Sequence, residues 1–322
     1  MAVIESRAHT PEAQELRTVY CNALIDAAER DEKIMILNCD MSTSMGTNPF
    51  VKRFPERSFN LGIQEANACG TAAGLSLMGW KPFLHTFSAF LTRRIYDQIF
   101  LSCGYAGLDV KLVGGDAGVS TASNGGTHMP FEDVGLLRLV PGAVIAEPAD
   151  GAAMAALVPQ LADYYGLSYL RMPRRKAVRM YESGTEFIIG KANVIREGRD
   201  VSIIASGMLV YEALLAADML LEQGIHARVV DMFTIKPLDR DCVLACARET
   251  GAIVTAENHN YMNGLGSAVA ETLVESLPVP MERIGVRDQF GEVGTVEYLM
   301  ERFELSAPFI YRKALECIAR KR

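Results

Sequence analysis

The stretch KPFLHTFSAFLTRRIYDQIFLSC, residues 81–103, joins two patterns that differ in period. Residues 81–87 have the apolar and aromatic content of a buried strand, and residues 89–103 have apolar side chains at helical spacing. Polar and aromatic side chains fall between them, where the strand ends. A strand followed directly by a helix is the repeating unit of parallel α/β sheets.

The same alternation extends along the chain in two series. The first has strands predicted at 34–40, 81–87, 110–115 and 143–148 and helices at 13–30, 64–77, 89–103 and 150–165. The second has strands predicted at 200–206, 226–232, 252–258 and 281–286 and helices at 208–223, 239–250 and 265–277. The sequence therefore predicts two doubly wound, mostly parallel α/β domains, 1–172 and a smaller one at 190–322, joined by a polar linker at 173–189.

Composition excludes several classes of protein. The chain has 322 residues, 49% of them hydrophobic, and a net charge of −7, which predicts a globular protein and disfavours nucleic acid as a partner. A basic cluster at 171–179 is the exception, and both a solvated linker and a functional role stay open for it. The N-terminus lacks a signal-peptide pattern and no apolar run reaches 18 residues, so we expect neither secretion nor membrane spanning.

Cysteine usage points to a reducing compartment. The seven cysteines are odd in number and form no CxxC pair. This pattern disfavours a disulfide framework or a zinc ribbon, and we expect free thiols in a cytoplasmic protein.

Several long polar loops follow predicted strands. They are CDMSTSMGT (39–47), HTFSAF (85–90), GGDAGVSTASNGGTHMP (114–130) and ENHNYMNGLGS (257–267). Because ligands of open parallel sheets bind beyond the carboxyl ends of the strands, these loops are predicted to form a site.

Three features of these loops and of the stretch FNLGIQEANACG (59–70) have both functional and structural interpretations. Glu65 is either a desolvated acid that stays protonated and donates a hydrogen bond, or a residue that compensates a helix dipole. Phe87 and Phe90 form either a floor for a planar ring or part of a core. His128 is either a hydrogen-bonding or proton-shuttling group, or a surface residue.

Two further possibilities have little support in the spacing of the residues. His128, Asp116 and Glu132 do not have a familiar metal-ligand spacing, so we predict no metal ligands in this chain. The segment GLGSAV (264–269) precedes a predicted helix and could cradle a phosphate, but it lacks the third glycine of a dinucleotide fingerprint.

Taken together, the residues resemble the carboxyl-terminal half of a transketolase: a pyrimidine-binding domain followed by the transketolase C-terminal domain. The order and spacing of the pieces along nearly the whole chain carry the resemblance. They are LGIQEAN (61–67), HTFSAFLTRRIYDQI (85–99), NGGTHMPFED (124–133), VVDMFTIKPLD (229–239), AEN (256–258) and GLGSAVAE (264–271).

The resemblance implies thiamine diphosphate as the cofactor. Glu65 is then the carboxyl group that binds its aminopyrimidine ring and promotes loss of the thiazolium proton, and Phe87 and Phe90 pack on that ring. Asp40 is a further candidate for cofactor binding. An aromatic residue often follows in the family at the position of Arg93, so the pocket wall departs from the family here.

The resemblance also implies a partner. In the family, a Gly-Asp-Gly motif and a downstream Asn hold the diphosphate and Mg²⁺, and this sequence has no such motif. We therefore expect an N-terminal transketolase subunit that carries the diphosphate-binding domain and holds Mg²⁺. Two copies of each chain would form a heterotetramer.

Substrate residues follow from the same resemblance. Arg17, Ser44 and Arg171 fall where the family binds the sugar phosphate, and two guanidinium groups suit such an anion. His128 matches a catalytic and substrate-binding histidine. Asp116 stands where many members have His, and Asn124 replaces an Asp that reads a donor hydroxyl, so we expect transfer of a two-carbon ketol unit from an altered or branched ketose phosphate to an aldose acceptor.

A deoxyxylulose phosphate synthase-like fragment is a less favoured alternative, because those chains normally carry all domains, and two further rival interpretations stay open. The beta subunit of a 2-oxoacid dehydrogenase shares both domains and also lacks the diphosphate motif. A non-catalytic scaffold subunit of the same fold is the other alternative, although it would not require the combination of Glu65, Phe87, Phe90 and His128.

Overall fold

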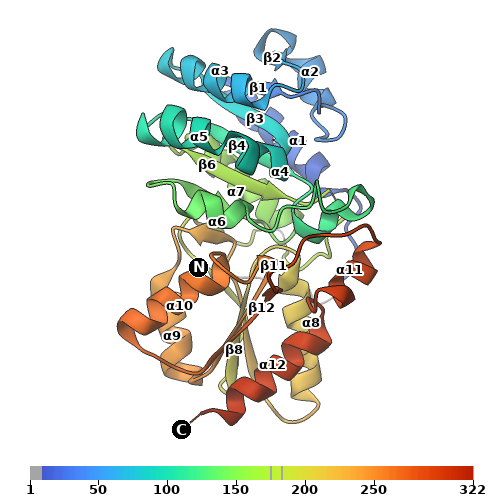
Figure 1. Ribbon diagram of the computed structural model, residues 1–322, viewed down its shortest axis with the longest axis vertical. Helices are drawn as coiled ribbons and strands as arrows, with labels where there is room; N and C mark the ends of the chain where they lie inside the picture. Colours follow the sequence, from blue (N-terminus) through green and yellow to red (C-terminus); the bar gives the residue numbers. More distant parts are fainter. Residues whose placement is uncertain (1–8, 175, 183, 322) are drawn as a thin grey trace.

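The computed structural model describes residues 9–174, 176–182 and 184–321. Residues 1–8, which begin the N-terminal segment without a signal-peptide pattern, lie outside the described residues, as do residues 175 and 183 of the predicted linker and the final residue. The described chain forms two open α/β sheets that lie one above the other along the long axis (Figure 1).

The first sheet has seven strands in the order β10-β5-β6-β4-β3-β1-β2. The strands in chain order are β1 (Ile34–Asn38), β2 (Ser58–Asn60), β3 (Lys81–Phe87), β4 (Lys111–Gly115), β5 (Val144–Ala146), β6 (Ser168–Met172) and β10 (Thr234–Lys236). All neighbours pair in parallel except β10, which runs antiparallel to β5. The strands β1, β4 and β6 are buried along their whole length, as expected for a parallel sheet that is covered on both faces.

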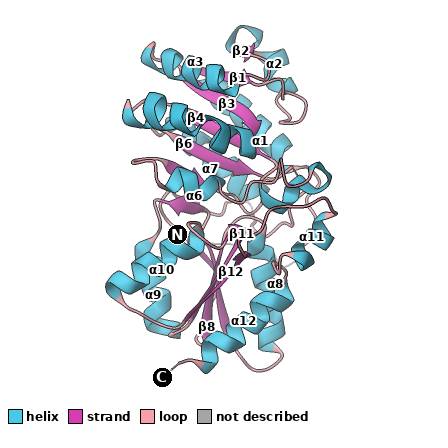
Figure 2. Cartoon of the chain, viewed as in Figure 1, coloured by secondary structure: helices cyan, strands magenta, loops and turns pink. Residues whose placement is uncertain are grey.

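Helices cover both faces of the first sheet (Figure 2). The α-helices of this domain are α1 (Leu16–Arg30), α2 (Asn48–Arg53), α3 (Glu65–Leu77), α4 (Ser88–Thr92), α5 (Tyr96–Gln98), α6 (Asp133–Arg138) and α7 (Gly151–Asp163). In Figure 1, α3, α4 and α5 lie in front of the sheet, and α1 and α7 pack together behind it. The 3₁₀ segment η4 (Gly118–Asn124) follows β4.

The second sheet has five strands in the order β12-β11-β8-β9-β7. Its strands are β7 (Asn193–Arg196), β8 (Val201–Ala205), β9 (Ala227–Asp231), β11 (Ile253–Asn260) and β12 (Met281–Val286), and only β7 is antiparallel to its neighbour. Its helices are α8 (Leu209–Leu221), α9 (Arg240–Thr250), α10 (Leu265–Ser276), α11 (Val296–Arg302) and α12 (Ala307–Ala319). Helices α9 and α10 pair on one side, and α8 and α12 on the other (Figure 1).

The predicted fold class is confirmed, with local differences. The predicted helix 89–103 is a series of short pieces: α4, a 3₁₀ turn η2 (Arg93–Ile95), α5 and the π-helical segment η3 (Ile99–Tyr105). The strands β2 and β10, with three residues each, are absent from the prediction because so short a segment shows no periodicity. The strands β6 and β7 and the helices α2, α6, α11 and α12 are absent from it as well.

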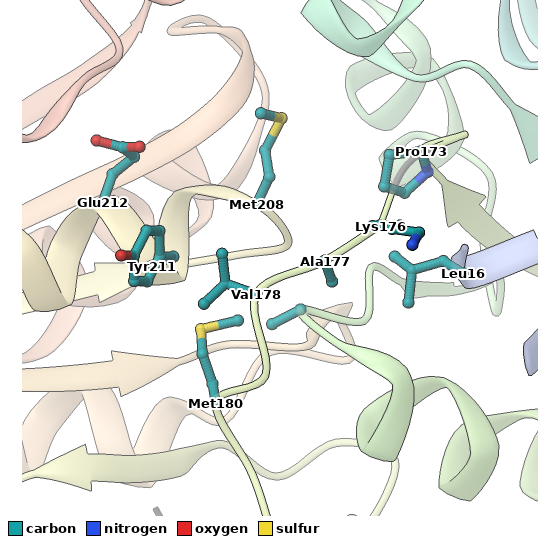
Figure 3. A pocket seen from close by; sticks show the side chains of 10 residues that line it. Leu16, Pro173, Lys176, Ala177, Val178, Met180, Met208, Tyr211 and Glu212 are labelled. Carbon is teal, nitrogen blue, oxygen red and sulfur yellow. The ribbon is translucent and has the colours of Figure 1, made fainter. Parts of the chain in front are cut away.

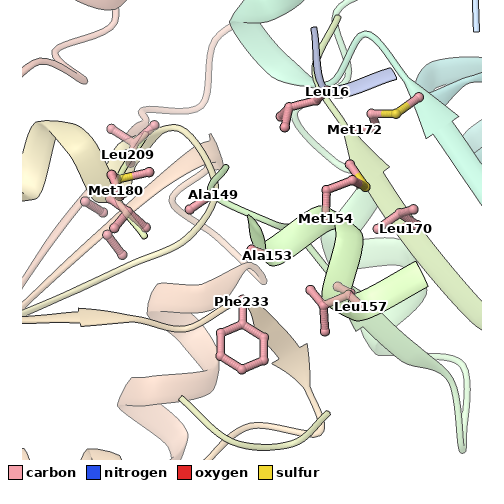
Figure 4. Close-up of a cluster of buried hydrophobic side chains, with 14 of the residues drawn as sticks. Leu16, Ala149, Ala153, Met154, Leu157, Leu170, Met172, Met180, Leu209 and Phe233 are labelled. Atoms are coloured by element: carbon pink, nitrogen blue, oxygen red, sulfur yellow. The ribbon is translucent and has the colours of Figure 1, made fainter. Parts of the chain in front are cut away.

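A continuous apolar core joins the two sheets. Figure 4 shows part of it, with Met154 and Leu157 of α7 facing Leu170 of β6, and with Leu209 of α8 and Phe233 nearby from the second domain. All of these side chains are buried. The two domains therefore share hydrophobic packing.

Two chemical expectations concern the whole chain. All seven cysteines are free thiols, and six of them are buried. Of the helices in the described part of the chain, none is long and apolar enough to span a bilayer.

Candidate active site

Glu65 is the first residue of α3 and is only 3% exposed. Its Oε2 atom lies 2.9 Å from Nη1 of Arg94, and Thr86 Oγ1 donates a 3.5 Å hydrogen bond to Oε1. The positive end of the α3 dipole also faces this carboxyl group. A buried acid at the start of a helix, with a partly exposed arginine as its partner, can exchange that partner for a ligand.

Two aromatic rings stand next to this acid. Phe87 ends β3 and Phe90 lies in α4, and their ring centroids are 6.2 Å apart with the planes tilted by 51°. The Arg94 guanidinium carbon lies 3.9 Å from the Phe90 ring centroid. Arg94 therefore contacts Glu65 and Phe90 at once, and the sequence analysis did not identify it.

His128 closes the other side of the aromatic pair. Its ring meets Phe87 edge to face at 6.0 Å and Phe90 at 5.0 Å between centroids. Thr127 Oγ1 lies 2.8 Å from His128 Nδ1, which leaves Nε2 for a ligand. The structure thus brings together Glu65, Phe87, Phe90 and His128, which the sequence separates by more than sixty residues.

Arg93 contacts the loop that carries His128. Its guanidinium group contacts Glu132 Oε1 at 2.9 Å and the Thr127 carbonyl oxygen at 2.5 Å. The side chain that replaces an aromatic residue therefore ties the start of η2 to the loop that carries His128.

Asp116 follows β4 and is 2% exposed, in a left-handed backbone conformation with φ 55°. Arg174 covers it with a bidentate ion pair, in which Nε donates to Oδ1 at 3.0 Å and Nη2 donates to Oδ2. The Arg174 guanidinium carbon is 5.6 Å from the Phe87 ring centroid. Arg174 is the second cation at this site that the sequence analysis did not identify.

Arg171 requires a correction. Its side chain is fully buried inside β6, where Nε donates to Asp133 Oδ2 at 2.7 Å, Nη1 to Glu147 Oε1 at 2.5 Å and Nη2 to the Asn258 carbonyl oxygen at 2.7 Å. Burial alone would raise the pKa of Asp133, but the charges of Arg171 and His259 and the hydrogen bonds from Arg171 and Tyr169 together outweigh burial and hold that pKa below its ordinary value. With no exposed surface and its N–H groups engaged, Arg171 is not placed to bind a sugar phosphate.

Arg17 and Ser44 lie together on the loop side of the first sheet. Arg17 Nη1 donates to the Ser44 carbonyl oxygen at 2.9 Å, and its Nε lies 2.5 Å from Glu15 Oε2. The adjacent Met45 packs against Gly115, the last residue of β4, where a methyl group would lie 2.5 Å from its sulfur. This packing brings the 43–46 loop next to the strand end that carries Asp116.

Asp40 and Asn124 occupy exposed loop positions. Asp40 follows β1 and exchanges two hydrogen bonds with the Asn60 side chain, at 2.9 and 3.0 Å. Asn60 also accepts a bond from Gly62, so this pair fixes the turn that leads to Glu65. Asn124 ends η4 and is exposed, four residues before His128.

The GLGSAV segment is occupied by a carboxylate of the same chain. Glu257 accepts hydrogen bonds from the backbone N–H groups of Leu265 at 2.7 Å and Gly266 at 2.8 Å, at the start of α10. Burial raises the pKa of Glu257 to about 7, and burial lowers the pKa of the neighbouring His259 to about 4. The idea that this helix start cradles a phosphate is therefore wrong.

Two cavities flank the site. The cavity in Figure 3, about 180 Å³, lies between the domains and is lined mainly by apolar side chains from Leu16 to Tyr211, with Lys176 and Glu212 at its rim. None of the predicted site residues lines it. A second cleft of about 430 Å³ adjoins the His128 loop, with Arg93, Glu132 and the exposed Phe290 among its lining residues.

A metal centre is a separate question from the pocket. Among the described residues, no group of three or more His, Cys, Asp or Glu side chains is placed to hold a metal ion.

Comparison with known families covers nearly the whole chain. Residues 12–179 match the transketolase pyrimidine binding domain, and residues 190–310 match the transketolase C-terminal domain.

Similar proteins include chains that are named as transketolase subunits. The chain is 48% identical over 306 residues to the 6-deoxy-6-sulfo-D-fructose transketolase subunit of Clostridium sp. (strain MSTE9), covering 95% of both chains. It is 36% identical to a subunit of the apulose-4-phosphate transketolase of Phocaeicola vulgatus, covering 94% of this chain and 97% of that one. A solved split gene transketolase, described as an inactive beta4 tetramer, superimposes with a TM-score of 0.89 at 40% identity over 97% of this chain and 100% of that one.

Proposed function

This chain belongs to the transketolase family, and we propose that it is the pyrimidine-binding subunit of a transketolase built from two different chains. The complex transfers a two-carbon ketol unit from a ketose carrying an anionic group, such as a ketose phosphate, to an aldose acceptor. The observation that carries this proposal is the buried Glu65 beside the two rings of Phe87 and Phe90.

The pocket residues fit the pyrimidine ring of thiamine diphosphate. An aminopyrimidine presents a polar edge and two apolar faces, and the pocket offers a buried carboxyl group next to aromatic side chains. Arg94 now contacts both Glu65 and Phe90, so a ring that enters the pocket must displace the Arg94 side chain, which is 45% exposed and free to move toward water. When bound, thiamine diphosphate supplies the nucleophilic carbon and the electron sink for ketol transfer.

Each side chain of the pocket then has a defined task. Glu65 holds a proton at the polar edge of the pyrimidine. His128 Nε2 forms a hydrogen bond with the carbonyl or hydroxyl group of the donor, while Thr127 orients the ring through Nδ1. In this proposal Asn124 reads a donor hydroxyl and Asp40 borders the cofactor.

Arg174 and Arg17 bind the anionic end of the substrate in this proposal. Arg174 lies beyond the carboxyl end of β6, stacks near Phe87 and is one third exposed, whereas Arg171 inside the strand is closed to solvent. Arg17 and Ser44 lie near the end of β4, the strand that pairs with β6, through the contact between Met45 and Gly115.

The diphosphate and Mg²⁺ belong to the partner chain in this proposal. Relatives of matching length are named as subunits, and the solved beta4 tetramer is described as inactive, which supports a requirement for a second chain. Apolar side chains gather on α3 and η3, which pack together beside Glu65: Leu77, Met78, Leu101 and Tyr105 are all more than half exposed. We propose this surface as the contact with the N-terminal subunit, in a heterotetramer of two copies of each chain in the cytoplasm.

The two rival functions fit the comparisons less well. Two relatives that this chain matches over nearly their whole length, at 48% and 36% identity, are named transketolase subunits, which favours ketol transfer over the decarboxylation of a 2-oxoacid. The named substrates of these relatives carry a sulfo or a phosphate group, which agrees with guanidinium groups at the site.

The proposal is tested by assembly and turnover. The chain is co-expressed with its N-terminal partner, and native mass spectrometry measures the stoichiometry and bound thiamine diphosphate before ketol transfer is assayed. We expect equal amounts of the two chains, one cofactor for each pair and turnover only in the complex. Ketol transfer by this chain alone would refute the partner requirement, and a cofactor-loaded complex that transfers no ketol unit would refute the function.

A further inference from the structure

Both arginines at the anionic end of the site are already paired with carboxylates of the same chain. Arg17 contacts Glu15, and Arg174 contacts Asp116 through both oxygens. Two positive and two negative charges therefore face this part of the site. A phosphate pocket built from unpaired guanidinium groups would have a strongly positive charge, and this one does not.

Asp116 cannot turn away from Arg174. Its backbone is held at φ 55°, its carbonyl oxygen accepts a 2.7 Å hydrogen bond from Thr121 Oγ1, and its carboxylate is 2% exposed beneath the guanidinium group. The negative charge is thus a fixed part of the site. The pairing uses the Nε–H and one Nη2–H, and Arg174 keeps three further N–H groups for a ligand.

Sulfonate and phosphate groups differ mainly in charge at such a site. Both present three oxygens around a tetrahedral centre to hydrogen-bond donors. A sulfonate carries one negative charge, whereas a phosphate ester has a second ionisation near pH 6 and is mostly a dianion above pH 7. Each additional charge on the ligand is repelled by the buried Asp116 carboxylate, and the low dielectric around that group strengthens the repulsion.

We propose that Asp116 is a specificity-determining residue that makes the site favour a ketose ending in a sulfonate over one ending in a phosphate dianion. This inference rests on the proposed function. Asp116 acts through Arg174: it fixes the direction of the guanidinium group and cancels its charge, so that a single negative charge on the substrate is preferred. The other charged or titratable groups that face this point are Arg17, Glu15 and His128.

The test compares two ligands that differ in one group. The complex with the partner chain and thiamine diphosphate is assayed with the 6-phosphate of a hexulose and with the 6-sulfonate of the same hexulose. We expect kcat/KM to be about tenfold higher for the sulfonate. In Asp116→Asn, which keeps the shape and removes the charge, we expect kcat/KM for the phosphate to rise about tenfold and that for the sulfonate to change less than threefold.

Asp116→Glu is the matched control, because it keeps the negative charge. It retains the preference for sulfonate even if both rates fall. A variant Asp116→Glu that prefers the phosphate as strongly as Asp116→Asn does would overturn the inference, since charge would then not be the cause.

The pH dependence gives a readout that a structural role of Asp116 would not produce. The ratio of the two kcat/KM values cancels ionisations of the enzyme and leaves the phosphate ester as the titrating group. Between pH 5.5 and 7.5 we expect the sulfonate-to-phosphate ratio to rise at least fivefold in the wild-type complex and to stay flat in Asp116→Asn. If Asp116→Asn does not assemble, the wild-type ratio alone decides, and a flat ratio contradicts the inference.

The outcomes separate the two proposals. A complex that turns over neither ketose refutes the proposed function and this inference with it. A complex that transfers ketol units but prefers the phosphate at pH 7.5 refutes only the role of Asp116.

Discussion

Arginine pairs with buried acids in two regions of this molecule, and the arginines differ in their access to water. At the junction of the domains, Arg171 is fully buried with Asp133 and Glu147. In the pocket, Glu65 and Asp116 are equally buried, but Arg94 and Arg174 are 45% and 33% exposed.

This difference in exposure separates arginines that stabilise the fold from arginines that can give way to a ligand. A buried arginine cannot leave, because its departure would strand two carboxylates without water or a partner. A partly exposed arginine can move into water and give its place to a ligand, so the acid beneath it becomes available. By this criterion the Arg171 cluster at the domain junction has a structural role, whereas the acids under Arg94 and Arg174 belong to a ligand-binding site.

The largest effect on stability is expected when Arg171 is removed. In Arg171→Met the carboxylates of Asp133 and Glu147 stay buried without their cation, so we expect the free energy of unfolding to fall by about 3–5 kcal/mol. Urea titration of the purified chain measures it. Arg53→Met, which removes an exposed pair with Glu29, is the control and should change the free energy by less than about 1 kcal/mol. Equal losses in the two variants would refute the distinction.

Glu257 gives the junction a pH dependence with a definite sign. Burial raises the pKa of Glu257 to about 7 from the ordinary value of 4.5, so the folded chain keeps this proton to higher pH than the unfolded chain. Folding therefore loses stability as the pH rises from about 4.5 to about 7, by on the order of 3 kcal/mol.

The Glu257 effect is measured as the difference between wild type and Glu257→Gln in the free energy of unfolding across that pH range. His259, whose pKa burial lowers to about 4, opposes the trend, and its Nδ1 lies 3.7 Å from Glu257 Oε2, so the same comparison is also made in a His259→Asn background. We expect the wild type to lose stability relative to the variant as the pH rises. A difference that is constant with pH would show that Glu257 titrates normally.

Glu65→Gln tests the pocket side of the comparison. The amide keeps the shape but cannot serve as the proton donor to the pyrimidine, so we expect kcat of the assembled complex to fall at least about 100-fold, equivalent to about 2.7 kcal/mol. Pre-steady-state ketol transfer measures the loss, and circular dichroism checks the fold. Glu29→Gln, far from the pocket, should keep wild-type activity. A Glu65→Gln complex with near wild-type kcat would remove Glu65 from the mechanism.

Arg174→Met is expected to have the smallest effect on stability. Its removal uncovers Asp116 to water instead of stranding it, so the free energy of unfolding should change by at most about 1 kcal/mol. The KM for an anionic ketose should rise at the same time, since the site loses a guanidinium group. Thermal and urea unfolding measure the first effect and steady-state kinetics the second. A loss of stability as large as that in Arg171→Met would show that Arg174 has a structural role like that of Arg171.

The sequence predicts the two domains, most of the strands and the central members of the pocket. Glu65 starts the helix after β2, Phe87 ends β3, and His128 lies between β4 and α6, and the fold brings such positions to one edge of a parallel sheet. Their roles in cofactor binding and catalysis stay predictions. The periodicity also fails where elements are short, as in β10 and in the broken helix after β3.

The choice between Arg171 and Arg174 depends on structural information that the sequence alone does not give. The two residues are three positions apart in one basic cluster, and resemblance alone selected the first. Arg171 is the fourth residue of β6, inside the sheet, whereas Arg174 lies beyond the strand end, where ligands bind. Two features decide between them: where the strand ends, and which acids from distant segments, such as Asp133 and Glu147, reach the side chain. Neither feature follows from the local spacing of residues in the sequence.

The antiparallel pairing of β10 with β5 affects the order in which the chain can fold during synthesis. Strand β5 has β6 on one side, and its other edge is covered only by Thr234–Lys236, which belong to the second half of the sequence. On the ribosome, the first sheet therefore keeps an open edge until β7, β8, α8 and β9 of the second domain have been made. A nascent chain that stalls before Lys236 exposes that edge to other chains, and the first domain reaches its finished form only late in synthesis.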